Sequence, residues 1–177
     1  MSEQGMTSRR GLLALGGAAG AAAVAGALSR TAEQAQAQTG PVAQKGTITL
    51  EAAMQLVTAA EAKARELGVQ IAVAVVDEGG LLRAFGRMTG QNSAATTDIV
   101  QNKAYTAAAF RTPTHIFAER NAEPARLTSF ANLPRVTLLG GGYPITRDGA
   151  TIGGIGVGGG TPEQDQQIAE AALATLG

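Results

Sequence analysis

Residues 150–165 of the chain are ATIGGIGVGGGTPEQD, and this stretch decides much of the fold. Its first half alternates glycine with isoleucine and valine, which predicts a strand over 150–157. The Asp148-Gly149 pair just before it is a strong two-residue hairpin signal. We therefore expect an antiparallel partner strand over 143–147, because a short hairpin forces antiparallel pairing.

The second half of the stretch begins a helix. Thr161, Pro162 and Gln164 supply an N-cap, a proline at the first helical position and a capping-box glutamine, which predict a final helix to about residue 176. The glycines before it carry no side chain, so the final helix or a neighbouring subunit is expected to pack tightly against the strand.

Residues 154–159 also match G-x-G-x-x-G, which taken alone suggests a dinucleotide site. The rest of the sequence holds one predicted helix, without the second strand and the acidic residue about 20 positions on that such a site uses. We therefore expect no nucleotide site here.

The remaining elements follow from hydrophobic spacing and turn residues. Apolar residues recur three and four positions apart in a first helix, and a tight turn over 77–80 separates two strand-like runs. Arg111 to His115 break a central helix that Thr96 or Thr97 can cap. The expected elements are helix 50–67, strands 69–76 and 81–87, a helix from 96 or 97 to about 110, a short helix 114–121, an irregular surface loop 123–134 and a strand-like run 135–140. This order predicts an α+β fold, with an antiparallel β-sheet flanked by α-helices in a single domain.

The N-terminal segment has the features of an export signal. Arg9 and Arg10 precede an uncharged run over 11–29, and Ala35-Gln36-Ala37 fits a cleavage pattern. We predict a twin-arginine signal peptide over 1–37, a linker over 38–46 and a domain over 47–177. An N-terminal membrane anchor is the alternative. The expected location is periplasmic or secreted, with no membrane span after cleavage.

Composition excludes several classes of protein. Fourteen basic residues balance 14 acidic ones, so no basic stripe for nucleic acid is expected. The absence of cysteine excludes a disulfide framework, a zinc finger, an iron–sulfur cluster and a thiol nucleophile. A single histidine excludes HExxH zinc chemistry.

That histidine, His115, lies in the most informative region. Tyr105, Phe110, Phe117 and Phe130 fall near it in the sequence. An imidazole can ligate a metal or haem iron, or act as an acid or base. An apolar pocket with few polar groups suits a planar cofactor. The alternatives are an exposed histidine in the first turn of a helix and aromatic residues that simply form core.

Lys103 is predicted on the inward side of the central helix. Snorkelling toward the helix rim is the favoured explanation, and a ligand contact is the alternative.

Four stretches in order resemble one known family. These are the hairpin 73–88, the run KAYTAAAFRTPT at 103–114, and the glycine-rich segments 140–145 and 152–165. Together they resemble the GlcG/HbpS-like family of haem-binding or haem-degrading domains, over about 47–177. The resemblance implies a helix-flanked antiparallel sheet with profilin-like layering and a homo-oligomer. In some members it implies haem binding with peroxidase-like degradation or redox sensing.

The resemblance also implies site residues around the central helix and the break after it. His115 or Thr114 would approach the metal, Phe110 would line the ring, and basic side chains would meet the propionates. The sequence departs from the family at Arg111-Thr112, where members often have Gly-Arg, and after Met88, where an acid often follows. The implied haem-binding set is Arg87, Lys103, Thr106, Phe110, Arg111, Thr112, Thr114 and His115.

The expected function is therefore that of an exported haem- or tetrapyrrole-binding protein, with haem-degrading or redox-sensing activity. Two alternatives stay open at this point. One is a non-catalytic oligomeric accessory or sensor module without a cofactor. The other is a small-molecule enzyme that acts on organic acids. Whether the protein is an enzyme is left open.

Overall fold

The computed structural model describes residues 44–177, of which 45–177 form one compact unit. The predicted signal peptide 1–37 and residues 38–43 of the predicted linker lie outside the described residues. Within the described part of the chain, no helix is both long and apolar enough to cross a membrane. The elements, in chain order, are α2 (Leu50–Glu66), β1 (Ala72–Asp77), β2 (Leu82–Arg87), α3 (Ala94–Phe110), α4 (Thr114–Arg120), α5 (Pro124–Ala131), β3 (Gly142–Arg147), β4 (Ala150–Gly158), α6 (Pro162–Leu173) and η1 (Ala174–Leu176).

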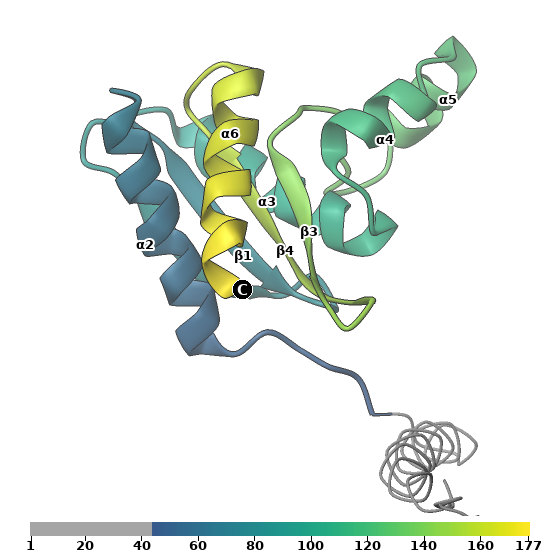
Figure 1. Ribbon diagram of the computed structural model, residues 1–177. Helices are drawn as coiled ribbons and strands as arrows, with labels where there is room; N and C mark the ends of the chain where they lie inside the picture. Colours follow the sequence, from purple (N-terminus) through teal and green to yellow (C-terminus); the bar gives the residue numbers. More distant parts are fainter. Residues whose placement is uncertain (1–43) are drawn as a thin grey trace, which may run out of the picture. The chain divides into compact units, whose positions relative to one another are not determined.

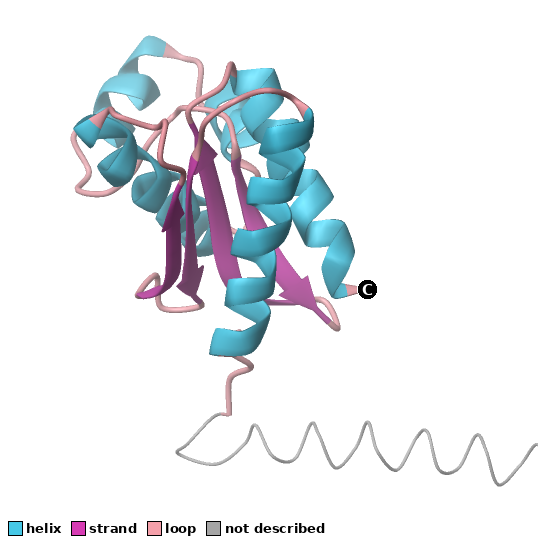
Figure 2. Cartoon of the chain, turned by 90° about the vertical axis from the view of Figure 1, so that its left-hand side faces the viewer, coloured by secondary structure: helices cyan, strands magenta, loops and turns pink. Residues whose placement is uncertain are grey.

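The four strands form one antiparallel sheet in the order β2-β1-β4-β3 (Figure 1). Helices α2 and α6 cover one face of the sheet, and α3 covers the other. Figure 2 shows the sheet between these helical layers. The prediction of an α+β fold with a helix-flanked antiparallel sheet in a single domain is confirmed.

Alternation along β1 divides the core between the two faces. Val73 and Val75 join the larger apolar cluster, with α2 and α6, while Ala72, Ala74 and Val76 join a smaller cluster with α3. Because both faces are covered, every residue of β1 is buried. Successive side chains of a strand point to opposite faces of the sheet. Because the side chains that β1 directs toward α3 are small, the helix can come close to the sheet.

The glycines of β4 let α3 lie directly on the sheet. A Cβ built on Gly156 would lie 2.6 Å from the backbone nitrogen of Ala104, and a Cβ on Gly154 would lie 3.1 Å from that of Ala108. On β3, a Cβ on Gly142 would lie 2.5 Å from the carbonyl oxygen of Lys103. The close approach that the glycines predicted is present, but the helix is α3. The final helix, α6, packs on the opposite face, so the prediction that it contacts these glycines is wrong.

Helix ends follow the sequence signals at two of the long helices. The Thr49 hydroxyl accepts a hydrogen bond from the Ala52 backbone N–H at 3.2 Å. At α6 both hydrogen bonds of the predicted capping box are present. The Thr161 hydroxyl accepts the Gln164 backbone N–H, and the Gln164 side chain accepts the Thr161 backbone N–H. Helix α3 differs, because it begins at Ala94 after Ser93 and not at Thr96 or Thr97.

Two predictions for the middle of the chain are wrong. The segment 123–134 contains helix α5, which has Pro124 at its first position. The helix is only eight residues long and none of its residues is buried, so its apolar side is too short to establish a period in the sequence. The segment 135–140 pairs with no strand of the sheet. It is held instead by the Thr106 hydroxyl, which accepts a hydrogen bond from the Thr137 N–H at 3.0 Å.

We predict that Gly156→Ala destabilises the protein by about 3 kcal/mol or more, because the new methyl group meets helix backbone that cannot repack. Urea unfolding followed by circular dichroism measures this change. Gly79→Ala is the control, since a Cβ there meets only the Asp77 carboxylate, at 3.3 Å. Equal free energies of unfolding for the two variants would contradict the close contact between α3 and β4.

Candidate functional site

A buried ion pair joins α3 to α6. The Lys103 ammonium lies 2.8 Å from Asp165 Oδ2 and also donates to the Val157 carbonyl oxygen at 2.7 Å. The exposed fractions of the two side chains are 4% and 5%. The other Asp165 oxygen accepts the Gly160 N–H at 3.0 Å. The prediction that Lys103 snorkels to the helix rim is therefore wrong, because its charge is neutralised inside the protein.

Glycine makes this arrangement possible. A Cβ on Gly141 would lie 3.0 Å from Lys103 Nζ, so a side chain there would displace the ammonium. Burial raises the pKa of Asp165, against the opposing effect of the Lys103 charge. Taking both charges out of water costs enough that such a pair adds little to stability, whereas removing one partner costs about 3–5 kcal/mol. The pair therefore fixes where α3 and α6 meet.

The chain turns sharply at the end of α3. Arg111 adopts the left-handed conformation, at φ 53° and ψ 37°, where glycine is more usual. Pro113 then precedes α4, and the fully buried Thr114 anchors its first turn to β3. The Thr114 hydroxyl accepts the Gly142 N–H at 2.9 Å and donates to the Gly142 carbonyl oxygen at 3.5 Å. This turn holds α4 beside the edge strand of the sheet.

An aromatic cluster forms where α3, α4 and α5 meet. The Phe110 ring centroid lies 4.3 Å from that of Phe117 and 5.7 Å from that of Phe130, and the Phe117–Phe130 separation is 4.9 Å. Three aromatics predicted near one another are thus in contact. Tyr105 is not part of this cluster, because the Arg135 guanidinium lies 4.1 Å over its ring.

His115 faces a different neighbour from those expected. Its ring centroid lies 5.7 Å from that of Tyr143 on β3, at an interplanar angle of 48°. The residue is half-buried, and its Nδ1 is buried without a hydrogen-bond partner among the described residues. The Tyr143 hydroxyl donates to Glu170 Oε1 on α6 at 2.6 Å. The prediction that the four aromatics surround His115 is therefore replaced by a row of three residues, His115, Tyr143 and Glu170.

The other predicted site residues occupy three places. Thr106 is fully buried and ties α3 to the 135–137 backbone, and Thr112 donates to the Phe110 carbonyl oxygen at 3.0 Å. Arg111 is exposed at the α3 turn. Arg87 is exposed at the end of β2, on the opposite edge of the sheet from β3. The structure thus places residues 110–115 of the predicted set at the α3–α4 turn, with Lys103 and Thr106 buried further back along α3 and Arg87 apart. Their roles toward a cofactor stay predictions.

Haem is the group that the sequence resemblance implies, and the two predicted iron ligands differ in how they fit it. The Thr114 hydroxyl is buried and already forms hydrogen bonds with the Gly142 backbone, so it does not fit an iron ligand. His115 is partly exposed beside the Tyr143 ring, and its Nδ1 has no hydrogen-bond partner among the described residues. Ligating histidines ordinarily donate their second N–H to an acceptor, and the described residues supply none at Nδ1. Of the two predicted iron ligands, His115 is therefore the one that fits haem, with an acceptor for its Nδ1 absent from the described residues.

Several residues of this region were missed from sequence. Asp165 sits in the first turn of α6, where an acid already has an explanation as a partner of the helix dipole. Tyr143 was noted only as part of a glycine-rich motif. Glu170 is an exposed helix residue with no distinguishing pattern. Only the fold brings these residues to Lys103 and His115, so no local signal could have found them.

Comparisons with known proteins agree with this fold. The model of the family described as haem degrading protein HbpS-like matches residues 48–174. An uncharacterized 15.0 kDa protein of Citrobacter freundii is 42% identical over 132 residues, which cover 73% of this chain and 92% of that protein.

Two solved structures are similar as well. A double mutant of HbpS from Streptomyces reticuli is 35% identical, with a TM-score of 0.72, over 79% of this chain and 94% of that one. A complex of PduOC with haem is 34% identical, with a TM-score of 0.65, over 72% of this chain and 94% of that one.

The Tyr143 contact predicts a pH dependence of stability. Burial and the hydrogen bond to Glu170 raise the pKa of Tyr143 above its ordinary value of 10.0. The native state therefore retains the Tyr143 hydroxyl proton to a higher pH than the unfolded chain does. The stabilisation from Tyr143 is fully present below pH 10.0 and is lost as the pH rises above it.

The chain has two tyrosines, so an alkaline titration of tyrosinate absorbance measures this effect directly. We expect one tyrosine to ionise only as the protein unfolds, and Tyr143→Phe to remove that phase. If both tyrosines ionise together while circular dichroism still reports native structure, the contact is not formed.

Proposed function

The chain belongs to the HbpS-like family of haem degrading proteins, and from this premise we propose that it binds haem or a related tetrapyrrole at the α3–α4 turn. The observation that carries the proposal is His115, whose imidazole is half-buried beside the Tyr143 ring and has an unpartnered nitrogen among the described residues. The haem complex of PduOC, at 34% identity, supports haem as the ligand class.

Each group in the region has a proposed part. The half-buried rings of Phe110 and Phe130 offer an apolar surface for a planar macrocycle, and the buried ring of Phe117 packs against both. Arg111 is exposed next to that cluster and would pair with a propionate. The imidazole of His115 would hold the iron, and bound haem would supply redox chemistry, as in degradation or sensing. Thr114 and Lys103 position α4 and α3 from inside the fold.

We also propose that a homo-oligomer completes the site. A buried imidazole nitrogen without a partner costs about 1–3 kcal/mol, and ligation at the other nitrogen requires an acceptor for it. A second copy of the chain would supply that acceptor.

Export by the twin-arginine route to the periplasm or beyond is likewise part of the proposal. It is supported by Arg9-Arg10, the apolar run and the predicted cleavage site.

Titration of the full chain with hemin, followed by the Soret band, tests the ligand. We expect a shifted Soret band that saturates with the protein. His115→Ala should weaken binding by at least about tenfold, because loss of an outer partner alone typically costs that much at a metal site.

Glu119→Ala is the matched control, since Glu119 is an exposed residue on the same short helix. It should leave the hemin titration unchanged. An unshifted Soret band in the parent protein would refute haem binding. Equal affinities of the parent protein and His115→Ala would refute this site.

A further inference from the structure

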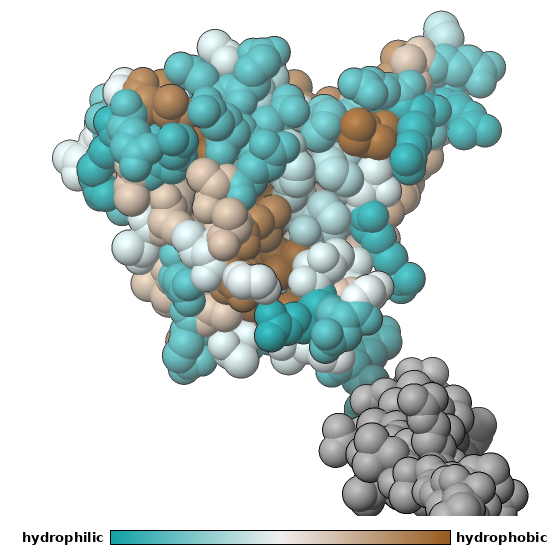
Figure 3. Space-filling view, in the orientation of Figure 1, coloured by the Kyte–Doolittle hydropathy of each residue, from teal (hydrophilic) through white to brown (hydrophobic). Residues whose placement is uncertain are grey.

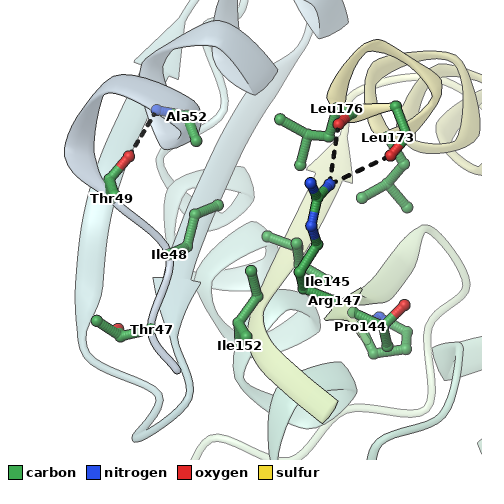
Figure 4. Close-up of a pocket in the computed structure, with 12 residues that line it drawn as sticks. Thr47, Ile48, Thr49, Ala52, Pro144, Ile145, Arg147, Ile152, Leu173 and Leu176 are labelled. Atoms are coloured by element: carbon green, nitrogen blue, oxygen red, sulfur yellow. Dashed lines mark hydrogen bonds between the residues drawn. The ribbon is translucent and has the colours of Figure 1, made fainter. Parts of the chain in front are cut away.

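A groove of about 370 Å³ lies at the other end of β3 from the Thr114–Gly142 contact. It opens between the start of α2, the β3–β4 hairpin and the end of α6. Figure 4 shows its walls, and Figure 3 shows hydrophobic surface exposed beside the C-terminal end of α6 in this part of the molecule. Its volume falls in the range of small-molecule sites, roughly 300–1,000 Å³. Its lining residues are distinct from those around His115.

The walls of the groove are mostly apolar. The side chains of Ile48, Ile145, Ile152, Leu173 and Leu176 line it from four separate segments of the chain. Ile48 and Ile145 are almost completely buried and belong to the larger core cluster. A hollow with such walls would bury the apolar part of a ligand against a rigid core.

One cationic side chain, that of Arg147, also lines the groove. Arg147, the last residue of β3, directs its guanidinium toward the chain's C-terminal residues (Figure 4). Its Nη1 donates to the backbone oxygens of Leu176 at 3.5 Å and Gly177 at 3.3 Å, both longer than a usual N–H···O bond of about 2.9 Å. Among the described residues, no aspartate or glutamate pairs with it.

This combination defines a ligand class. A guanidinium presents a planar set of donors that a carboxylate can accept in pairs, and such bonds are shorter than the two contacts that Arg147 makes within the chain. Apolar walls favour an alkyl or aryl tail and disfavour a second charge. From the groove and Arg147 we infer a second binding site, for a small amphiphilic carboxylate whose apolar tail lies against the isoleucine and leucine side chains.

The ligand carboxylate would replace the two long backbone contacts of Arg147. The Thr47 hydroxyl also lines the groove and adds a neutral polar group at its rim. Thr49 is less available, because its hydroxyl already accepts the Ala52 N–H. The site therefore recognises one negative charge through one guanidinium, and does not depend on the haem proposal for His115.

Isothermal titration calorimetry of the full chain with octanoate, octanol and octylammonium tests the inference. These probes share a tail and differ in the charge of the head group. We expect octanoate to bind more tightly than octanol, and octylammonium to bind least. Arg147→Gln should weaken octanoate roughly 10- to 100-fold and leave octanol unchanged, as expected for one charge-assisted hydrogen-bond pair.

Two further variants make the result specific. Ala52→Leu fills the groove without changing charge and should weaken both octanoate and octanol, by about tenfold or more. Arg126→Gln removes an exposed guanidinium on α5 and should change neither. Circular dichroism and hemin titration should match the parent protein for Arg147→Gln, which separates this site from that of His115.

Three results would overturn the inference. One is the absence of octanoate binding to the parent protein, as when a second subunit covers the groove. Another is equal affinity for octanoate and octanol, which would show an apolar surface without carboxylate recognition. The third is octanoate affinity that Arg147→Gln leaves unchanged.

Discussion

The direct contact between the backbone of α3 and the glycines of β3 and β4 sets the position of the other elements. A strand with ordinary side chains would hold a helix several ångströms further from the sheet. Here a Cβ on Gly142 or Gly156 would lie within 2.6 Å of α3 backbone atoms. The glycines that resemble a nucleotide-binding motif therefore act as a docking surface within the fold. Since interiors pack densely, even one added methyl group cannot be absorbed.

The close approach has chemical consequences on both sides of the helix. It brings Lys103 near enough to β4 to reach the Val157 carbonyl oxygen and Asp165, so a lysine without access to water is neutralised. It also fixes the end of α3, where Arg111 reverses the chain and Thr114 ties α4 to Gly142. The phenylalanine cluster and His115 are thus presented by rigid elements. The groove around Arg147 lies at the opposite end of β3, on the face covered by α2 and α6.

The sequence predicted the elements with strong local signals. The Asp148-Gly149 hairpin, the α6 capping box and the apolar face of α2 were all found, because each depends on residues a few positions apart. It did not predict which helix covers the glycines, nor the Lys103–Asp165 pair, whose members are 62 residues apart. Helix α5 was missed because it is only eight residues long, too short to establish a helical period. The break between α3 and α4 was predicted from the residues over 111–115, and its role as a haem site came from the family resemblance, whereas the contact of His115 with Tyr143 required the fold.

Paramagnetic broadening of backbone amide signals by added hemin tests the central claim most directly, because it maps the bound iron without any substitution. We expect signals from residues 110–117 and 140–143 to broaden first, since these segments lie around the α3–α4 turn and His115. Broadening centred on Arg147 and the groove beside it, or no residue-specific broadening at all, would contradict the account.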